Sequence, residues 1–349
     1  MSKPTKTNTL PPELVPWVEK YRPKRLDDVA AQEEAVQVLR RSIDSKNLPH
    51  LLLSGTPGNG KTSTIMALAR ELYGPALMKS RVLELNASDE RGISIIREKV
   101  KNFARMTVST NVLNEKGEEP PPYKIIILDE ADSMTTDAQS ALRRTMETYS
   151  KTTRFCLICN YVSRIIEPLA SRCAKFRFKP LTVEQGMARL QYIVECEGVS
   201  INQDEMDGAL QTIIKASDGD LRRAIMLLQS AHSLHRNTPG GLTSAHIDEI
   251  SGAIPNAVIN GLVQQWQTRL PLRAFDELAD GIRALIDEGY SATQVIAQVH
   301  PILMQDERLS SKQKAKLAMI LGDVDKRLVD GADETLLLTD LAMQAAGVM

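Results

Sequence analysis

A glycine-rich segment near residue 55 combines the residue types that bind phosphate groups. Gly55, Gly58 and Gly60 let the backbone turn tightly, so that its N–H groups can face phosphate oxygens. Lys61 and Thr62 complete the pattern G-x-x-x-x-G-K-T. A lysine at this position can reach the β and γ phosphates of a nucleotide, and the threonine hydroxyl can ligate Mg²⁺. The segment therefore predicts a site for a nucleoside triphosphate.

Two acidic residues, Asp129 and Glu130, follow a run of four apolar residues at 125–128. A continuous apolar run is typical of a strand that is covered on both faces, and hence of a parallel sheet flanked by helices. Acids at the carboxyl end of such a strand lie where open α/β sheets bind ligands. We expect Asp129 to hold Mg²⁺ through water and Glu130 to orient and polarise the attacking water. Together with the phosphate loop, this pair indicates nucleotide hydrolysis.

The elements that must position these residues follow from hydrophobic periodicity. From residue 181 the pattern becomes helical almost throughout, and the Pro-Gly-Gly stretch within 237–241 is the clearest linker. The predicted strands are 51–54, 81–86, 124–129, 155–159 and 174–178, and the predicted helices before residue 181 are 32–46, 63–72, 93–106 and 137–149.

Composition excludes several classes of function. The 43 basic and 44 acidic residues nearly cancel, so no global positive field draws the chain to nucleic acid. Aromatic residues make up only 4%, which argues against base stacking as the main mode of recognition. No apolar run reaches membrane-spanning length and no signal peptide is visible, so we expect cytosol or nucleus. Cys156 and Cys159 have metal-site spacing, but residues three apart on a strand point to opposite faces, which favours core packing.

Four features have two interpretations each on pattern alone. The segment 17–23, which holds a Trp and a Tyr, is either a hydrophobic anchor or a cover for a nucleotide base. Arg97 and Lys101 lie one turn apart on a helix that either contacts DNA phosphates or faces solvent. Asn160, at a strand end, either contacts a γ-phosphate or caps a turn. Arg222 either reaches a nucleotide or is simply exposed.

The order of these motifs resembles that of AAA+ ATPases of the clamp-loader clade. The stretches 17–23 and 85–92 resemble the small subunits of eukaryotic replication factor C more narrowly, and 72–75 with 330–334 point to one branch of those subunits. The motifs that carry the resemblance are the phosphate loop, Asp129-Glu130, Asn160, Ser171-Arg172-Cys173 and Gly219-Asp220-Leu221-Arg222.

The resemblance implies an α/β fold in which an AAA+ P-loop parallel sheet is followed by two helical parts. Residues 1–15 are then expected to be a disordered tail, and residues 16–180 the AAA+ ATPase domain. Residues 181–240 would form a small helical lid. Residues 241–349 would form an all-helical collar that mediates oligomerisation.

The resemblance also implies the function and the partners. The chain would bind and hydrolyse ATP, with Mg²⁺, as one subunit of a five-subunit clamp loader. This complex opens the PCNA sliding clamp and loads it onto primer–template DNA in the nucleus, for replication and repair. Its partners would be the other four subunits, PCNA and DNA, with no membrane. Two alternatives stay open: a homo-oligomeric AAA+ remodeller of protein or branched DNA, and a subunit that binds ATP only to hold a complex together.

Finally, the resemblance assigns roles to individual residues. Arg172 would act in trans on a nucleotide held by a neighbouring subunit, as an arginine finger. Asn160 and Arg222 would be sensors of the γ-phosphate, and Arg97 and Lys101 would contact the DNA backbone. The residues implied to bind the nucleotide are Val18, Arg22, Ala30, Gly55, Thr56, Pro57, Gly58, Asn59, Gly60, Lys61, Thr62, Ser63, Asn160 and Arg222.

Overall fold

The computed structural model describes residues 14–29, 32–88, 93–106, 119–201, 206–236, 241–267 and 274–349, with the backbone alone at 93–97, 245, 267, 274 and 277. The chain divides into two compact units, with the boundary between Leu242 and Thr243. Ala30, residues 237–240 of the expected linker and most of the expected N-terminal tail lie outside the described residues.

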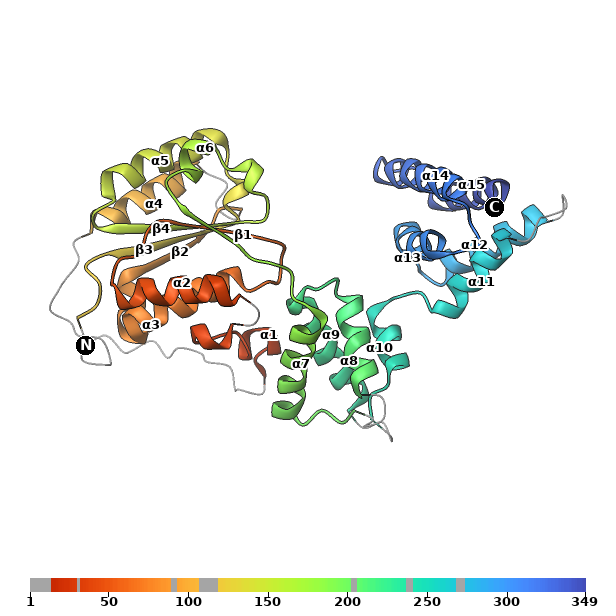
Figure 1. Ribbon diagram of the computed structural model, residues 1–349, viewed down its shortest axis with the longest axis horizontal. Helices are drawn as coiled ribbons and strands as arrows, with labels where there is room; N and C mark the ends of the chain where they lie inside the picture. The colour runs from red at the N-terminus through yellow and green to blue at the C-terminus, as the bar shows by residue number, and fades with distance from the viewer. Residues whose placement is uncertain are drawn as a thin grey trace, which may run out of the picture. The chain divides into compact units, whose positions relative to one another are not determined.

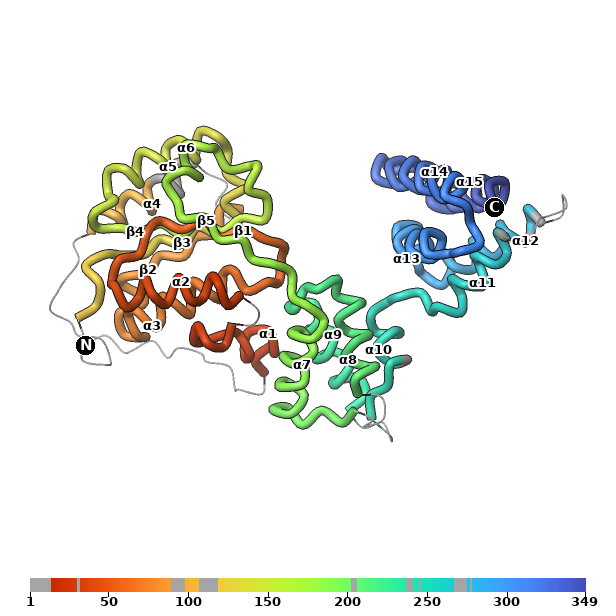
Figure 2. Tube along the Cα trace, in the orientation of Figure 1, coloured from red at the N-terminus to blue at the C-terminus, as the bar shows by residue number. Residues whose placement is uncertain are grey.

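The first unit is built on a parallel sheet of five strands in the order β2-β3-β4-β1-β5. β1 lies between β4 and β5 and pairs with both in parallel, and Figure 2 shows β5 beside it. This strand order brings the end of β1, where the phosphate loop begins, next to the end of β4. The strands are β1 (Leu51–Ser54), β2 (Val82–Asn86), β3 (Lys124–Asp129), β4 (Thr153–Cys159) and β5 (Ala174–Arg177).

Helices cover both faces of the sheet, as Figure 1 shows, so the central strands β1, β3 and β4 are largely apolar, whereas the edge strands β2 and β5 carry exposed charged residues. One face packs on α2 (Glu33–Asp44) and α3 (Lys61–Arg81), and the other on α4 (Ile93–Arg105), α5 (Thr136–Tyr149) and α6 (Glu167–Ala170). Alternate residues of these central strands enter the two cores in turn, as the pleat of a strand requires. The expectation of a parallel sheet between two helical layers is confirmed.

The cysteine pair follows this alternation. Cys156 belongs to the core on the α3 side and Cys159 to the core on the α5 side, and both are buried and unpaired. Burial raises the pKa of both thiols. Within the described residues, no group of three or more His, Cys, Asp or Glu side chains is arranged to hold a metal ion. Core packing, and not metal binding, is therefore what the structure supports.

The helix after the phosphate loop differs from its prediction. The periodicity predicts a helix over 63–72, whereas α3 runs from Lys61 to Arg81 with an interruption at Gly74, where φ is 67° and ψ 164°. Pro75 then starts a second helical segment, because proline is pre-organised for the first turn of a helix. The short helix α6 and the 3-10 turns η2 (Leu26–Asp28), η3 (Ala131–Ser133) and η4 (Val162–Arg164) were not predicted.

A three-helix group completes the first unit. α7 begins after a capping box in which the Thr182 hydroxyl accepts from Gln185 N and the Gln185 side chain accepts from Thr182 N. α9 begins at the cap Asp220, whose carboxylate accepts from the N–H groups of Arg222 and Arg223. The helices are α7 (Val183–Glu197), α8 (Met206–Ala216) and α9 (Leu221–His235), and the short α1 (Trp17–Lys20) packs against α9.

Every regular element that the structure describes in the second unit is a helix. Its core is a cluster of aliphatic side chains around the fully buried Trp266. Among the helices that the structure describes in either unit, none is both long and apolar enough to cross a membrane. The helices are α10 (Ser244–Ser251), α11 (Asn256–Gln267), α12 (Ala274–Asp287), α13 (Ala292–Gln305), α14 (Ser311–Val329) and α15 (Glu334–Val348).

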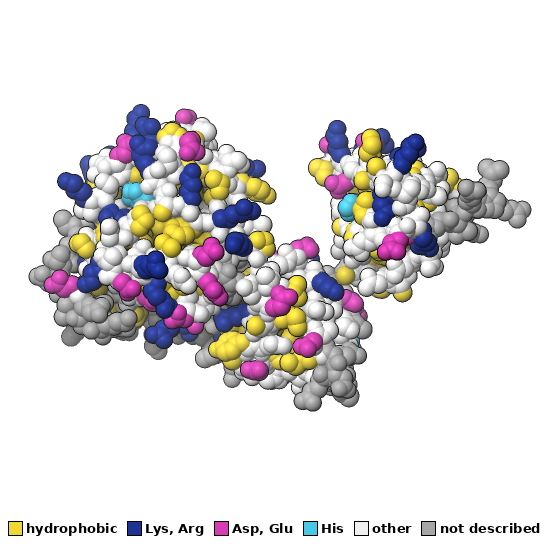
Figure 3. Space-filling model, viewed as in Figure 1, with side chains coloured by type: hydrophobic (Ala, Val, Ile, Leu, Met, Phe, Trp, Pro, Cys, Tyr) yellow, Lys and Arg dark blue, Asp and Glu magenta, His cyan; other side chains and the backbone are white. Residues whose placement is uncertain are grey.

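The surface carries charge of both signs. On the face shown in Figure 3, basic and acidic side chains are interspersed over each unit. This agrees with the near-zero formal net charge of −1. A nucleic acid would therefore be recognised through particular residues and not through a general field.

His50 makes the stability of the first unit depend on pH. It lies just before β1, its Nδ1 accepts a hydrogen bond from Phe155 N at 3.1 Å, and burial, with the nearby charge of Arg154, lowers its pKa from 6.5 to about 4. Because the unfolded chain binds this proton more readily, the contribution is complete above pH 6.5 and is lost as the pH falls to about 4. After discounting for partial exposure, we expect a loss of about 1–2 kcal/mol over that range.

Urea titrations between pH 4 and 7 measure this loss. His50→Gln should flatten the pH dependence of the free energy of unfolding, whereas the exposed His300→Gln should leave it as in the parent protein. An unchanged pH dependence in His50→Gln would assign the effect to other groups.

Candidate nucleotide-binding site

The phosphate loop joins β1 to α3 and has little space for a side chain at Gly55 and Gly58. Gly58 and Gly60 have φ values of 74° and 84°, a conformation that side chains disfavour. A Cβ at Gly55 would stand 2.4 Å from the carbonyl oxygen of Phe178, which follows β5. A Cβ at Gly58 would stand 1.9 Å from Asp220 Oδ1, at the start of α9. The loop is thus held between the sheet and the three-helix group.

Lys61 lies at the centre of this loop with its ammonium group pointing back along it. Its Nζ donates to the carbonyl oxygens of Gly55 at 2.7 Å and Thr56 at 2.9 Å, and to Asn160 Oδ1 at 3.0 Å. Burial lowers its pKa, and the charge of Arg222 acts in the same direction, while Asp129 and two weaker neighbours oppose the shift. A buried cation surrounded by weak acceptors is well placed to pair with an anion.

The threonine and the first acid meet as their positions in the sequence predict. Thr62 Oγ1 donates to Asp129 Oδ2 at 2.7 Å, although the two residues are 67 positions apart. The pairing of β3 with β4, and of β4 with β1, places the two strand ends at the same edge of the sheet. A hydroxyl and a carboxylate oxygen in contact are the kind of hard oxygen ligands that Mg²⁺ prefers. This donor set therefore fits a magnesium ion.

Glu130 has an unusual backbone conformation. Its φ is 52° and its ψ is 39°, in the left-handed region that non-glycine residues rarely adopt. The conformation is fixed because its carbonyl oxygen accepts from Ser133 N and Ser133 Oγ, and its N–H donates to Asp129 Oδ1. Such strain occurs mostly where function requires it. The side chain of Glu130 is exposed and lines the same cavity as Lys61.

Asn160 is supported by an acid that sequence analysis did not single out. Asp132 Oδ2 accepts from Asn160 N at 3.3 Å and from Tyr161 N at 3.1 Å, which ties the turn after β3 to the end of β4. The amide oxygen of Asn160 is then aimed at Lys61. A second acid three positions after Asp129, at the end of a strand that neighbours β4, was the sequence signal that could have revealed this contact.

The N-terminal segment is a hydrophobic anchor, and part of it also lies beside the phosphate loop. Trp17 is 7% exposed and packs near His232 of α9, so it is an anchor. Val18 and Arg22, on the other side of the turn, line the cavity beside the phosphate loop. The implied contact at Ala30 lies outside the described residues.

The segment is fastened to the three-helix group by polar contacts that no local pattern reveals. Tyr21 Oη donates to Glu197 Oε1 at 2.6 Å, and Arg189 Nη2 donates to the carbonyl oxygen of Tyr21 at 2.7 Å. The backbone N–H of Trp17 donates to Gln229 Oε1 at 3.0 Å. Burial and the Glu197 contact raise the pKa of Tyr21 well above its usual value.

One cavity in the first unit brings these groups together. Residues from several places line it, among them the N-terminal segment, the phosphate loop, the ends of β3 and β4, α7 and the start of α9. Arg222 lines it from α9, next to the capped first turn. Gly55 and Thr56 lie outside this lining but bind Lys61. The predicted residues that line the cavity are Val18, Arg22, Pro57, Gly58, Asn59, Gly60, Lys61, Thr62, Ser63, Asp129, Glu130, Asn160 and Arg222.

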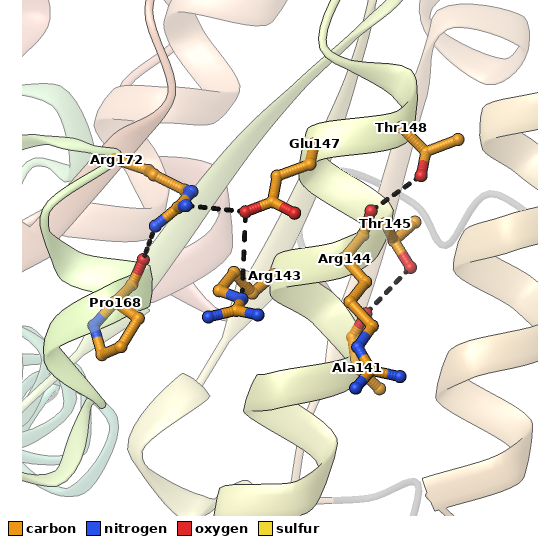
Figure 4. A network of polar contacts seen from close by, with 8 residues as sticks. All are labelled: Ala141, Arg143, Arg144, Thr145, Glu147, Thr148, Pro168 and Arg172. Carbon is orange, nitrogen blue, oxygen red and sulfur yellow. Dashed lines mark hydrogen bonds and ion pairs between the residues drawn. The ribbon is translucent and has the colours of Figure 1, made fainter.

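Three predicted residues lie away from this cavity. Arg172 follows α6, and its guanidinium bonds to Glu147 of α5 and to the carbonyl oxygen of Pro168, as Figure 4 shows. Lys101 is exposed on α4 and lines a separate groove with Arg144 of α5. The backbone of Arg97 belongs to α4, and its side chain is outside the described residues.

Gly58 offers a test of the fit between the loop and α9. We expect Gly58→Ala to weaken nucleotide binding by about tenfold more than Gly60→Ala, because an added Cβ meets Asp220 only at position 58. Both positions have positive φ, so backbone strain is common to the two variants. Titration with a fluorescent nucleotide measures the difference. Equal losses in the two variants would mean that the contact with Asp220 does not limit binding.

The fold and the site define the chain as an ATPase of the AAA class. Residues 51–181 match the "ATPase family associated with various cellular activities (AAA)", which binds nucleotide. Residues 188–233 match the "RCF1/5-like, AAA+ ATPase lid domain", and residues 254–344 match the "Replication factor C C-terminal domain". The predicted fold class and ATPase activity are confirmed.

The chain belongs to the replication factor C family. It is 54% identical over 336 residues to "Replication factor C subunit 2" of Schizosaccharomyces pombe, covering 96% of this chain and 95% of that one. It is 55% identical over 329 residues to "Replication factor C subunit 4" of Homo sapiens, covering 94% and 86%. The predicted resemblance to one branch of the small subunits is thus confirmed: that branch is numbered four in Homo sapiens and two in Saccharomyces cerevisiae.

Solved structures agree on the fold. The "Thermotoga maritima RuvB Holliday junction branch migration motor" superimposes with a TM-score of 0.51 at 17% identity, covering 80% of this chain and 91% of that chain. At this identity the likeness shows shared architecture alone.

Proposed function

We propose that this chain is an ATP-binding and ATP-hydrolysing subunit of a five-subunit clamp loader. In this role it would work with the other four replication factor C subunits in the nucleus to open the PCNA ring and place it on primer–template DNA. Family membership supports the assignment. The observation that carries it is the convergence of Lys61, Thr62, Asp129 and Asn160 at one edge of the sheet.

The loop and its lysine would bind the triphosphate. The N–H groups at the start of α3 and the partial positive charge of that helix favour an anion at this position. Lys61 would exchange its two carbonyl contacts for phosphate oxygens while keeping Asn160 within reach. Val18 and Arg22 would border the base, and Arg222 would approach the γ-phosphate from α9.

Thr62 and Asp129 would hold the magnesium ion, Thr62 directly and Asp129 through water. The ion supplies charge neutralisation at the β and γ phosphates when it is bound. Glu130 would orient the attacking water and accept its proton, and the fixed left-handed backbone keeps this carboxylate at the cavity. Asn160 would hold the γ-phosphate side of the site through its amide.

Arg172 would act on the nucleotide of a neighbouring subunit. Its position away from this chain's own cavity supports a role in trans. A cation at a transferring phosphoryl group stabilises the charge that develops there. Lys101 on α4, with Arg97 on the same helix, would contact the DNA backbone.

Reconstitution of the chain with four partner subunits tests the proposal. We expect ATP hydrolysis that rises when PCNA and primed DNA are both present, together with loading of labelled PCNA onto the DNA. A homohexamer of the isolated chain with full, clamp-independent activity would favour the remodeller alternative. Clamp loading that is unchanged by Glu130→Gln would favour a subunit that binds ATP without hydrolysing it.

A further inference from the structure

Arg172 is held in place by two contacts within its own chain. Its Nη2 lies 2.6 Å from Glu147 Oε1, and its Nη1 donates to the carbonyl oxygen of Pro168. Figure 4 shows the guanidinium between these two partners, which belong to α5 and α6. Two anchors fix both the position and the plane of the guanidinium group. An arginine offers five N–H donors, so enough remain for a phosphate.

These contacts contribute little to the stability of the chain. The side chains of Arg172 and Glu147 are 39% and 45% exposed, and ion pairs at this exposure are screened by water and salt. What the contacts do is restrict the rotamers of a long side chain. The side chain of Arg172 is therefore already ordered in the free subunit. Its loss of conformational entropy does not have to occur when it meets the nucleotide of a neighbouring subunit.

Glu147 lies on a helix, α5, that is anchored to the sheet, and a second arginine lies beside its carboxylate. Leu142 and Met146 bury their side chains against the sheet and so anchor α5. Arg143, one turn before Glu147, places its Nε 3.9 Å from the same Oε1. That Nε is buried and has no hydrogen-bond partner among the residues described. The group of Arg143, Glu147 and Arg172 therefore keeps a net charge of +1, which suits a surface that meets a polyphosphate.

We propose that Glu147 is a positioning residue for Arg172: the carboxylate orders the guanidinium so that it can meet the nucleotide of the adjoining subunit. The inference rests on the proposed trans role of Arg172. In this arrangement Glu147 touches neither the nucleotide nor the water. Its whole effect on catalysis passes through Arg172.

Hydrolysis at the neighbouring site measures this role. The assembly carries Glu130→Gln in this chain, so that its own site is silent. Glu147→Ala should lower kcat at the neighbouring site roughly fivefold, the worth of one immobilised side chain, and leave KM for ATP unchanged. Glu147→Asp, which keeps the charge, should recover part of the rate.

The matched control is Glu167→Gln. Glu167 is an exposed carboxylate on α6 whose ion pair is with Lys175 and not with Arg172. This variant should hydrolyse at the parent rate. If it loses as much activity as Glu147→Ala, a general effect of surface charge explains both and the positioning role is refuted.

A double substitution separates positioning from a structural role. If Glu147 acts only through Arg172, then Glu147→Ala adds no further loss in an Arg172→Ala background. Losses that multiply would refute the inference, and so would an increase in rate with Glu147→Ala, which would mean that the contact restrains Arg172. If Arg172→Ala itself leaves neighbouring hydrolysis intact, the trans role fails. If only Glu147→Ala is without effect, the trans role stands and the positioning role alone fails.

Discussion

Glu130→Gln should lower the multi-turnover ATPase rate of this chain's site by about two to three orders of magnitude, the range expected when a general base is removed. Glutamine has the size of glutamate but cannot accept a proton from water. Nucleotide affinity should change little, because the phosphate loop, Lys61 and the Thr62–Asp129 pair are unaltered. Rapid-quench hydrolysis assays on the reconstituted assembly, with nucleotide binding measured in parallel, give both quantities.

Glu84→Gln is the control for this substitution. Glu84 is an exposed carboxylate on β2 of the same sheet and does not line the cavity. It should hydrolyse ATP at the parent rate. If Glu130→Gln also retained the parent rate when the other sites of the assembly are silenced, the proposed general base would be wrong.

Arg172→Ala should depress hydrolysis at the adjoining subunit by roughly 10³-fold, the lower end of the effect of arginine fingers. This chain should still bind its own nucleotide, because Arg172 does not line its cavity. A mixed assembly isolates the effect: Glu130→Gln silences this chain's site, the equivalent substitution silences every other site except the adjoining one, and the remaining hydrolysis reports on that neighbour.

Arg177→Ala controls for the loss of an exposed cation beside β5. Arg177 ends β5, five positions beyond Arg172, and is likewise exposed. We expect neighbouring hydrolysis to persist in this variant. Equal depression by both substitutions would indicate a weakened assembly, which gel filtration would detect.

The sheet and the phosphate side of the site were predictable because their signals are local. The apolar run 125–128 and the loop 55–62 each fall within a few residues and allow little conformational choice. The parallel pairing then forces Asp129 next to Thr62, since both follow strand ends at one edge. The order of the strands and helices along the chain was therefore enough to predict that Asp129 and Thr62 meet.

The supporting contacts were not predictable because they join residues far apart in the chain. Trp17 meets Gln229 across 212 positions, and Tyr21 meets Glu197 across 176. The left-handed backbone of Glu130 is equally invisible to propensity, because it depends on where Ser133 can donate. Composition could not decide whether Lys101 faces DNA, and its exposure on α4 leaves that role as a proposal.

The attachment of the N-terminal segment has a mechanical consequence. Trp17 and Tyr21 are tied to α9 and α7, although Val18 and Arg22 beside them border the nucleotide cavity. A swing of the three helices away from the sheet would therefore move Trp17 and Tyr21 with it and would widen the cavity on two sides at once. Under the proposed function, such a swing would weaken the contacts with the base and with the phosphates together, and so would couple lid movement to nucleotide release.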